Sequence, residues 1–409
     1  LVVDDEPINI QVLNNYLKAN NYQVTQALSG KEALVALENN HNFDLVLLDL
    51  MMPNMTGYEV CSQIREKYPA QSLPVLMLTA KNQIADLVMG FQFGANDYLT
   101  KPFAKDELLT RIQTHIKLSK ITKAYERFVP HEYVELLSKE SIINVKLGDR
   151  VSTEMAIFFS DIRSFTTISE QMTSQETFAF VNGYLKEVCP EIRDRNGLII
   201  KFLGDGIMAV FPGGVDDALA AAIAQLKKLQ EYNQVLLSTG WMPIKIGIGI
   251  HWGHIMVGIV GEKGRMSGDA FSNNVNLTSR LEGLTKFYGV SLLISESAFN
   301  YLKNPQKYQI RFLDRASVKG IDEPINVYEV LDGEVDEIRE LKLQTQVDFA
   351  LGLESYRVGE LVDAKDYFEK VLAVNSSDKT AQLYLERIDD LMVTGVPKNW
   401  NGVWAFTHK

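Results

Sequence analysis

The feature that most constrains this chain is a glycine turn between two apolar runs near its middle. The runs Leu198–Leu203 and Ile207–Phe211 are rich in β-branched and aromatic residues, and Gly204-Asp205-Gly206 separates them. Because glycine accepts the positive φ that tight turns need, the stretch predicts a β-hairpin. A hairpin requires neither Asp205 at its tip nor Lys201 within the first run, so both charges are candidates for a function. A bare hairpin is the alternative.

Composition limits the class of protein. The length of 409 residues favours two or three domains, and 46% hydrophobic with 23% charged residues is ordinary for a soluble globular protein. A formal net charge of -11 argues against nucleic-acid binding, which needs a basic surface. The two cysteines, Cys61 and Cys189, are too few and too far apart for a disulfide framework, which fits a cytoplasmic location.

We expect no membrane segment in this chain. Its longest weakly charged stretch, Pro243–Gly261, is interrupted by Lys245, His251 and His254, and its β-branched, glycine-rich texture suits strands. The first residue is Leu1 rather than methionine, so we expect that further sequence precedes it.

Residues 1–118 alternate five short apolar runs with amphipathic segments of helical period, which predicts a doubly wound parallel five-stranded sheet. Ligands of such sheets bind at the carboxyl ends of the strands. Polar residues stand at those ends, and clustered carboxylates repel one another unless a cation lies among them. We therefore predict a Mg²⁺ site beside a place for a phosphoryl group, with merely solvated acids as the alternative. The runs are Leu1–Val3, Tyr22–Ala27, Phe43–Leu48, Val75–Leu78 and Asp97–Leu99, and the polar residues are Asp4, Asp5, Asp49, Thr79 and Lys101.

These residues stand in motifs that resemble the response regulator receiver domain. The motifs are Val-Val-Asp-Asp-Glu (2–6), Leu-Leu-Asp-Leu-Met-Met-Pro (47–53), Leu-Thr-Ala (78–80) and Tyr-Leu-Thr-Lys-Pro-Phe (98–103). The resemblance implies that a sensor histidine kinase, or a kinase domain upstream in the same chain, phosphorylates Asp49. It further assigns Asp4, Asp5 and Asp49 to Mg²⁺, Thr79 and Lys101 to the phosphoryl group, and Tyr98 to a switch that reorients with Thr79.

A helical linker is expected over 119–150. Leu118, Ile121, Tyr125 and Phe128 are spaced three, four and three apart, as on one face of a helix that continues the last receiver helix. After a proline, His131–Ser138 predicts a second short helix. The stripe can pack on its own domain or pair with a second copy, and the sequence leaves both open.

The region 151–333 contains a second group of acids. Glu154–Phe159 predicts a strand that leads to Asp161, and the backbone amides after it can cradle a phosphate. With Asp205 at the hairpin tip, two carboxylates on neighbouring strands can hold two divalent ions and orient a triphosphate. Farther on, Gly247–His251 and Ile255–Val260 predict a second hairpin.

Four motifs of this region together resemble the class III nucleotide cyclase catalytic domain. They are Phe-Ser-Asp-Ile-Arg-Ser-Phe-Thr (159–166), Lys-Phe-Leu-Gly-Asp-Gly (201–206), Asn-Asn-Val-Asn-Leu-Thr-Ser-Arg (273–280) and Val-Lys-Gly-Ile-Asp-Glu-Pro-Ile-Asn-Val-Tyr (318–328). The resemblance implies an α+β domain with a ferredoxin-like βαββαβ core. It also implies a homodimer with shared sites that convert ATP to 3′,5′-cyclic AMP and pyrophosphate, with two Mg²⁺ or Mn²⁺ ions per site. It assigns Asp161, Ile162 and Asp205 to metal, Phe165 and Thr166 to substrate, Lys201 and Asp269 to the purine, Asn276 to the ribose, Arg280 to the transition state and Lys319 to the triphosphate.

Two pairs of these residues, Asn276 with Arg280 and Lys201 with Asp269, also carry a physical argument of their own. Asn276 and Arg280 lie four apart, so they share a helix face and can address one ligand, although a surface contact is the alternative. Lys201 with Asp269 points to ATP, because adenine offers an acceptor at N1 and a donor at N6, the reverse of guanine. Asp269 departs from the cyanobacterial and soluble-cyclase branch, where threonine is typical, which leaves a bicarbonate response open.

Residues 334–409 have apolar and small residues at spacings that resemble a tetratricopeptide repeat. One repeat cannot bury its face alone, so we expect it to pack on the cyclase domain or on a partner, with Trp400–Trp404 as an anchoring contact. A plain helical extension is the alternative. For the whole chain, a catalytically silent dimeric scaffold is the alternative to a phosphorylation-controlled cyclase. A diguanylate cyclase would need a Gly-Gly-Asp/Glu-Glu-Phe loop, which residues 213–217 do not supply.

Overall fold

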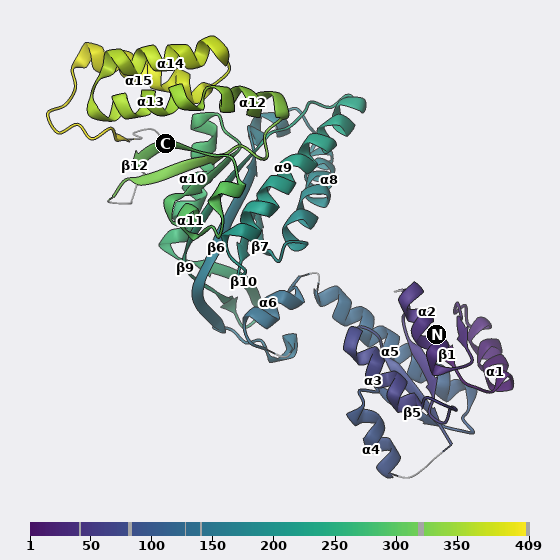
Figure 1. Ribbon diagram of the computed structural model, residues 1–409. Coiled ribbons are helices and arrows are strands. Elements are labelled where there is room, and N and C mark those ends of the chain that lie inside the picture. The colour runs from purple at the N-terminus through teal and green to yellow at the C-terminus, as the bar shows by residue number, and fades with distance from the viewer. Residues whose placement is uncertain (41, 81–83, 127, 140, 318–322, 406–409) are drawn as a thin grey trace. The chain divides into compact units, whose positions relative to one another are not determined.

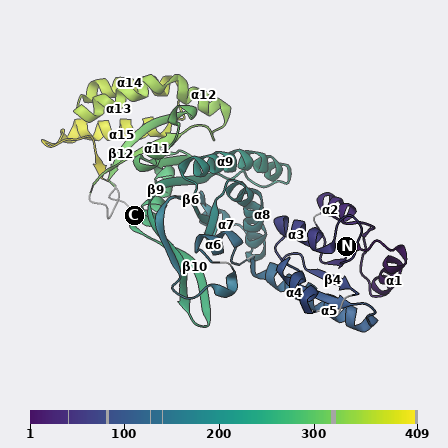
Figure 2. The same ribbon diagram turned by 60° about the horizontal axis from the view of Figure 1, so that its bottom comes forward.

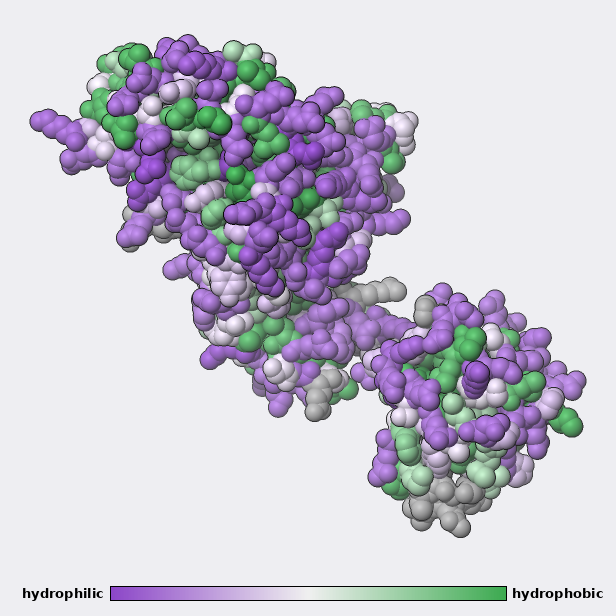
Figure 3. Space-filling model, in the orientation of Figure 1, coloured by the Kyte–Doolittle hydropathy of each residue, from purple (hydrophilic) through white to green (hydrophobic). Residues whose placement is uncertain are grey.

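In a computed structural model the chain forms two compact units, Leu1–His131 and Glu132–Lys409. The structure describes residues 1–40, 42–80, 84–126, 128–139, 141–317 and 323–405. Each unit has its own sheet and its own hydrophobic core (Figure 1). Hydrophilic residues dominate the surface seen in Figure 3, with small hydrophobic patches between them. Among the helices described, none has the length and apolar character needed to cross a membrane.

The first unit is a parallel five-stranded sheet in the order β2-β1-β3-β4-β5, which confirms the predicted doubly wound fold. Side chains of successive strand residues alternate between a core under α2 and α3 and a core under α1 and α5. The strands are β1 (Val2–Val3), β2 (Gln26–Ala27), β3 (Val46–Asp49), β4 (Val75–Thr79) and β5 (Asp97–Thr100), and the helices are α1 (Pro7–Lys18), α2 (Gly30–Asn39), α3 (Gly57–Lys67), α4 (Ile84–Gln92) and α5 (Lys105–Glu126).

Several predicted elements of this part of the chain differ in length from the structure, and the third strand, predicted over Phe43–Leu48, is β3 at Val46–Asp49. The second strand was expected over Tyr22–Ala27, but β2 lies at the sheet edge and pairs with a β1 of two residues, so only two of its residues find partners. The linker helix α6 (His131–Leu136) ends before Ser138, which adopts a left-handed backbone with φ 55°. Helix α5 does extend through the expected apolar stripe, and Leu118, Ile121, Tyr125 and Phe128 are exposed on it or just after it.

The second unit is built on a sheet in the order β14-β12-β13-β11-β9-β6-β8-β7, with β10 paired to β9. Its middle, β6-α8-β7-β8-α9-β9, has antiparallel neighbours in the order β9-β6-β8-β7, which is the predicted ferredoxin-like core. Helices α8 and α9 cover one face of this sheet. The elements up to β10 are β6 (Arg150–Ile162), α7 (Phe165–Ser169), α8 (Ser174–Arg193), β7 (Leu198–Leu203), β8 (Gly206–Phe211), α9 (Val215–Ser238), β9 (Ile246–Glu262) and β10 (Arg265–Phe271).

The first predicted hairpin is confirmed and the second is wrong. Leu203 pairs with Gly206, which leaves Gly204, at φ 71°, and Asp205 as the two turn residues. The stretches Gly247–His251 and Ile255–Val260 instead belong to one strand, β9, because the long strand β6 supplies a partner along it from Ile246 to Gly258. The hairpin forms later, where Glu262 pairs with Arg265 to join β9 and β10.

The glycines of β9 serve packing rather than a turn. A Cβ at Gly249 would lie 2.5 Å from the backbone nitrogen of Glu282 on α10, so the helix lies directly on the strand there. Ile248, between Gly247 and Gly249, and Ile250, after Gly249, face the core on the other side of the sheet, under α8 and α9. The remaining elements are α10 (Asn273–Tyr288), β11 (Leu292–Ser295), α11 (Glu296–Tyr301), β12 (Ile310–Ser317), β13 (Ile325–Val330) and β14 (Trp404–Ala405).

The helical tail belongs to the second unit and packs on its sheet (Figure 1). Phe349, Phe368 and Tyr384 of the tail share a core with Leu313 of β12 and with Tyr288 at the end of α10. Trp400 Nε1 donates to the backbone oxygen of Tyr356 at 2.8 Å, so this tryptophan does make an anchoring contact. The tail helices are α12 (Asp336–Gln344), α13 (Gln346–Val358), α14 (Leu361–Val374) and α15 (Lys379–Thr394).

Candidate functional site

The first unit brings two acids and a lysine together at the carboxyl ends of its strands. Lys101 Nζ donates to Asp4 Oδ2 at 2.7 Å and also to Asp49 Oδ1. Both carboxylates are buried, and the backbone N–H of Met51 donates to Asp49 Oδ2 at 2.9 Å. Burial raises the pKa of Asp49, while the lysine lowers it. Asp5 follows directly and is half-buried. Two of the three predicted magnesium ligands, Asp4 and Asp49, therefore bind a fixed cation.

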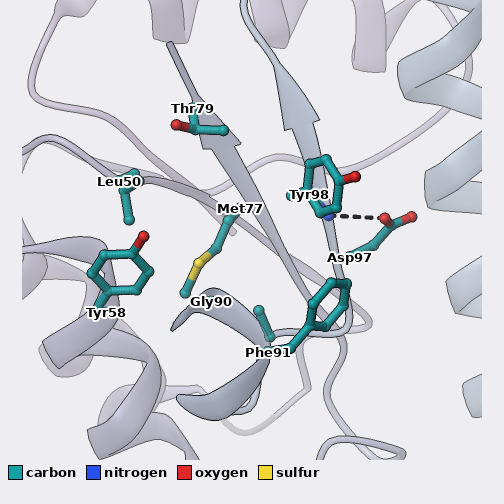
Figure 4. A pocket seen from close by; sticks show the side chains of 9 residues that line it. Leu50, Tyr58, Met77, Thr79, Gly90, Phe91, Asp97 and Tyr98 are labelled. Atoms are coloured by element: carbon teal, nitrogen blue, oxygen red, sulfur yellow. Dashed lines mark hydrogen bonds between the residues drawn. The ribbon is translucent and has the colours of Figure 1, made fainter. Parts of the chain in front are cut away.

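The proposed switch residues line a small cavity next to this group (Figure 4). Thr79 ends β4 and is buried, and Tyr98 on β5 is half-buried. In the view of Figure 4 the Tyr98 hydroxyl points away from Thr79. The ring of Phe91 packs edge-on against Tyr98, with 5.9 Å between ring centroids. The other lining residues are Leu50, Tyr58, Met77, Gly90, Ala95 and Asp97.

In the second unit, Asp161 and Asp205 lie side by side. Strand β6 pairs with β8, so the end of β6 meets the turn before β8. Asp205 Oδ2 accepts from the backbone N–H of Ile162 at 3.2 Å. A Cβ at Gly206 would lie 3.0 Å from Asp161 Oδ1, so glycine leaves space for this carboxylate. Burial, followed by repulsion from Asp205, raises the pKa of Asp161 to about 7.

A third acid, which the sequence analysis did not single out, lies near this pair. Glu282 on α10 is half-buried, and burial raises its pKa to about 7, with Asp205 adding to the shift and Arg163 opposing it. A Cβ at Gly247 would lie 2.6 Å from Glu282 Oε1, so this glycine also makes room for the carboxylate. Arg163 donates to the backbone oxygen of Val290, and burial lowers its pKa. The sequence signal was a lone carboxylate between apolar positions of a helix.

The predicted purine-reading residues face each other. Lys201 Nζ on β7 lies 2.7 Å from Asp269 Oδ1 and 2.9 Å from Oδ2 on β10, although 68 positions separate them in the sequence. Both side chains are partly exposed, so a ligand can reach them. Among the described residues, no hydrogen bond or ion pair joins this pair to Asp161 or Asp205.

The predicted ribose and transition-state residues lie on α10. The helix begins at a cap in which Ser272 Oγ accepts from the backbone N–H of Val275 at 3.1 Å, and its buried face packs on β9. Asn276 and Arg280 are exposed on it, one turn apart. Residue Lys319, predicted to hold the triphosphate, lies outside the described residues.

The structure limits the roles of Phe165 and Thr166, which open the short helix α7. The ring of Phe165 packs against Phe180 with 6.4 Å between centroids, so its side chain is committed to the core. Thr166 is exposed. A substrate contact at these positions would use their backbone N–H groups, because the first amides of a helix have no acceptor within it.

Metal binding fits the chemistry of these acids. Across the described part of the chain, no three His, Cys, Asp or Glu side chains converge as the ligands of a closed metal cage would. Mg²⁺, however, is typically held by one or two carboxylates together with waters and substrate phosphates. Asp161 and Asp205 supply two neighbouring carboxylates of this kind, and within the described residues no basic side chain forms an ion pair with either.

Comparison with protein families gives two matches. Residues 1–113 match the response regulator receiver domain, and residues 149–332 match the adenylate and guanylate cyclase catalytic domain. An adenylate cyclase of Anabaena cylindrica is 40% identical over 220 residues, which cover 52% of this chain and 44% of that protein. A terminal-differentiation-specific adenylate cyclase of Dictyostelium discoideum is 33% identical over 277 residues, 66% of this chain and 13% of that protein.

Thus the chain spans less than half the length of either relative. Among solved structures, a bacterial light-regulated adenylyl cyclase matches with a TM-score of 0.50 and 22% identity, over 61% of this chain and 73% of that one. This likeness supports the fold alone.

Proposed function

Because the chain belongs to the response regulator receiver family over residues 1–113 and to the adenylate and guanylate cyclase family over residues 149–332, we propose that it converts ATP to 3′,5′-cyclic AMP under the control of its receiver. The observation that carries this proposal is the pairing of Lys201 with Asp269 at 2.7 Å. An ammonium and a carboxylate held side by side match the acceptor N1 and the donor N6 of adenine. Guanine has the reverse pattern, so it would place a donor against the ammonium and an acceptor against the carboxylate.

In the reaction, the ribose 3′-oxygen forms a bond to the α-phosphorus and loses its proton, and the bond from that phosphorus to pyrophosphate breaks. Two divalent cations, held by Asp161, Asp205 and the backbone oxygen of Ile162, would supply charge neutralisation at the triphosphate and acidify the 3′-hydroxyl. Asn276 orients the ribose, and Arg280 stabilises the charge that develops at the α-phosphate. Lys319 holds the triphosphate by charge.

We further propose that the site is shared between two copies of the chain. Asn276 and Arg280 are exposed on α10, and they would complete a site whose acids come from the partner. Lys201 and Asp269 would then serve one site while Asp205, at the tip of the same hairpin as Lys201, serves the other. A monomer should accordingly be nearly inactive.

Control would come from phosphorylation of Asp49. Lys101, which hydrogen-bonds to both Asp49 and Asp4, would neutralise a phosphoryl group, and Thr79 and Tyr98, which would switch together, line the same small cavity (Figure 4). The donor would be a sensor histidine kinase or an upstream kinase domain. The buried free thiols of Cys61 and Cys189 support a reducing compartment such as the cytoplasm.

The test is turnover of ATP and GTP by the purified chain with Mg²⁺ or Mn²⁺, with and without acetyl phosphate. Lys201→Glu should lower kcat/KM for ATP by about 100-fold, since it places an acceptor against the N1 acceptor of adenine and a second carboxylate beside Asp269. Lys263→Glu in the β9–β10 turn makes the same charge change away from the purine pair and should leave kcat/KM within twofold.

The outcomes separate the alternatives. Absence of cyclic AMP under every condition would favour the silent scaffold. Equal use of GTP by the unmodified chain would remove the purine assignment. An Asp49→Ala variant that responds to acetyl phosphate as the unmodified chain does would remove the receiver as the controller.

A further inference from the structure

The linker helix α6 makes a buried contact with the β9–β10 hairpin, which carries Asp269. Figure 1 and Figure 2 both show α6 beside β10. Tyr133 of α6 is 3% exposed, and its neighbours Val134 and Leu137 are buried with it. The Tyr133 hydroxyl donates to the backbone oxygen of Gly258 at 2.8 Å and lies 3.5 Å from the backbone oxygen of Asp269. Burial raises the pKa of Tyr133 to about 12, so the hydroxyl remains a donor at neutral pH.

The two backbone oxygens belong to one pair of the β9–β10 ladder. Gly258 on β9 is the register partner of Asp269 on β10. Within the described residues, β10 pairs with β9 alone, so its other edge gains no ladder hydrogen bonds. A side chain that binds both members of one register pair therefore restrains the position of β10.

Packing reinforces this restraint. The ring of Tyr133 lies against Gly268, where an added Cβ would be 2.7 Å from ring atom Cζ. Successive residues of a strand point to opposite faces, so Tyr133 supports the face of β10 opposite to the Asp269 side chain. That side chain reaches Lys201 on the other face. Tyr133 thus lies directly behind the proposed adenine-binding pair.

We propose that Tyr133 is a positioning residue for the purine pocket, which makes α6 the element whose movement changes the affinity for ATP. This proposal rests on the proposed function for its substrate. Only residues 127–130 separate α5 from α6, so α6 is the first helix that follows the last receiver helix along the chain. Displacement of α6 withdraws the support behind Asp269 and leaves Asp161 and Asp205, on other elements, in place.

The first test is Tyr133→Phe, which removes the hydroxyl and keeps the ring. The KM for ATP should rise about three- to tenfold, as expected for one lost hydrogen bond, and the ratio of kcat/KM for ATP over GTP should fall. kcat and the Mn²⁺ concentration for half-maximal activity should stay within twofold. Tyr125→Phe on α5, where the hydroxyl is exposed, is the matched control and should change neither constant.

A second pair of variants tests the packing. Gly268→Ala should raise KM by driving the strand away from the ring, and adding Tyr133→Leu should restore part of the loss by making room. Additive effects in this cycle, or a Tyr133→Phe variant that lowers kcat and thermal stability with an unchanged KM, would overturn the proposal and leave a purely structural tyrosine.

Hydrogen exchange supplies a readout that does not need turnover. Amides of β10 should exchange faster in Tyr133→Phe than in Tyr125→Phe, and unchanged exchange would count against the positioning role. If the unmodified chain makes no cyclic AMP, the proposed function fails, while the exchange comparison still decides whether Tyr133 positions β10.

Discussion

The two units solve one electrostatic problem in different ways. Each places carboxylates close together at strand ends, Asp4 with Asp49 in the first unit and Asp161 with Asp205 in the second. In the first unit Lys101 lies between the acids and hydrogen-bonds to both. In the second, no lysine or arginine of the described chain forms an ion pair with either acid, and burial with mutual repulsion raises the pKa of Asp161 to about 7.

The difference is between a fixed cation and an exchangeable one. A covalently attached ammonium offsets the negative charge of the receiver acids when no metal is bound and lowers the pKa of Asp49 against the effect of burial, which suits a carboxylate that must act as a nucleophile. In the second unit, where the pKa of Asp161 is raised to about 7, a cation can replace a proton near neutral pH, which suits metals that arrive with a triphosphate. The variants below test this difference between the two sites.

The largest effect should come from Asp161→Asn. This change removes one negative charge from the site without a fixed cation, so loss of metal-assisted chemistry, worth several kcal/mol, should lower cyclic AMP formation about a thousandfold. Steady-state turnover at saturating Mn²⁺ measures it. Asp194→Asn, at the exposed end of α8, makes the same change elsewhere and should stay within twofold. A loss below tenfold for Asp161→Asn would show that these acids do not hold the catalytic metals.

The next effect should come from Lys101→Met, which removes the fixed cation. Asp4 and Asp49 would then face each other uncompensated, and the free energy of unfolding of the first unit should fall by about 2–3 kcal/mol without metal. Added Mg²⁺ should restore part of it. Denaturant unfolding followed with and without EDTA measures both.

Lys67→Met is the control for that change. It breaks an exposed pair with Glu38, so it should cost far less than Lys101→Met and should not depend on Mg²⁺. If Lys101→Met were no more costly than Lys67→Met, the lysine would not be the counter-charge of the receiver acids.

The contrast also shows what sequence alone can predict. The acids at strand ends and the turn around Gly204 can be predicted from local sequence patterns. A strand's alternation and a glycine suited to positive φ are both recognisable within about ten residues. The motifs then predict, through the family resemblance, that Asp161 and Asp205 belong to the same catalytic domain. The position of Lys201 against Asp269, 68 residues apart, was expected only through a family resemblance.

Other features depend on tertiary packing and could not be predicted from local sequence patterns. The stretches Gly247–His251 and Ile255–Val260 predict a hairpin, yet they form one unbroken strand in which Gly247 and Gly249 make room for α10. Glu282 reaches the acids only because α10 lies on that strand, and no spacing in the sequence encodes this contact. The contact of Tyr133 with Gly258, 125 residues away, is likewise a product of tertiary packing.

The smallest effect concerns the pH dependence of metal binding in the second unit. The pKa of Asp161 is raised from 3.8 to about 7, so below pH 7 a metal must displace a proton. Mn²⁺ affinity of the full chain should therefore rise about tenfold from pH 6 to pH 8, with release of about one proton at the lower pH. Titration calorimetry in buffers of different ionisation enthalpy measures both, with Asp49→Asn present to silence the receiver site.

Direct metal binding is a better readout than unfolding here. Between pH 4 and pH 7 the native state binds the Asp161 proton more tightly than the unfolded state, so this group's contribution to the unfolding free energy falls as pH rises. His251, whose pKa burial lowers to about 4, contributes with the opposite sign between pH 4 and its ordinary value of 6.5. The two contributions oppose each other in an unfolding experiment but not in metal binding.

Glu282→Gln sharpens the assignment of that proton. The groups that face Asp161 are Asp205, Glu282 and Tyr184, with Arg163 beyond Glu282, and only the two acids raise its pKa strongly by charge. With a pKa of about 7, Glu282 is mostly neutral at pH 6 and mostly charged at pH 8, so Glu282→Gln should leave Mn²⁺ affinity nearly unchanged at pH 6 and lower it about twofold at pH 8. An equal change at both pH values would mean that Glu282 acts by shape. No pH dependence in the unmodified chain would mean that Asp161 is ionised at pH 6 without metal and that the site carries no proton for the metal to displace.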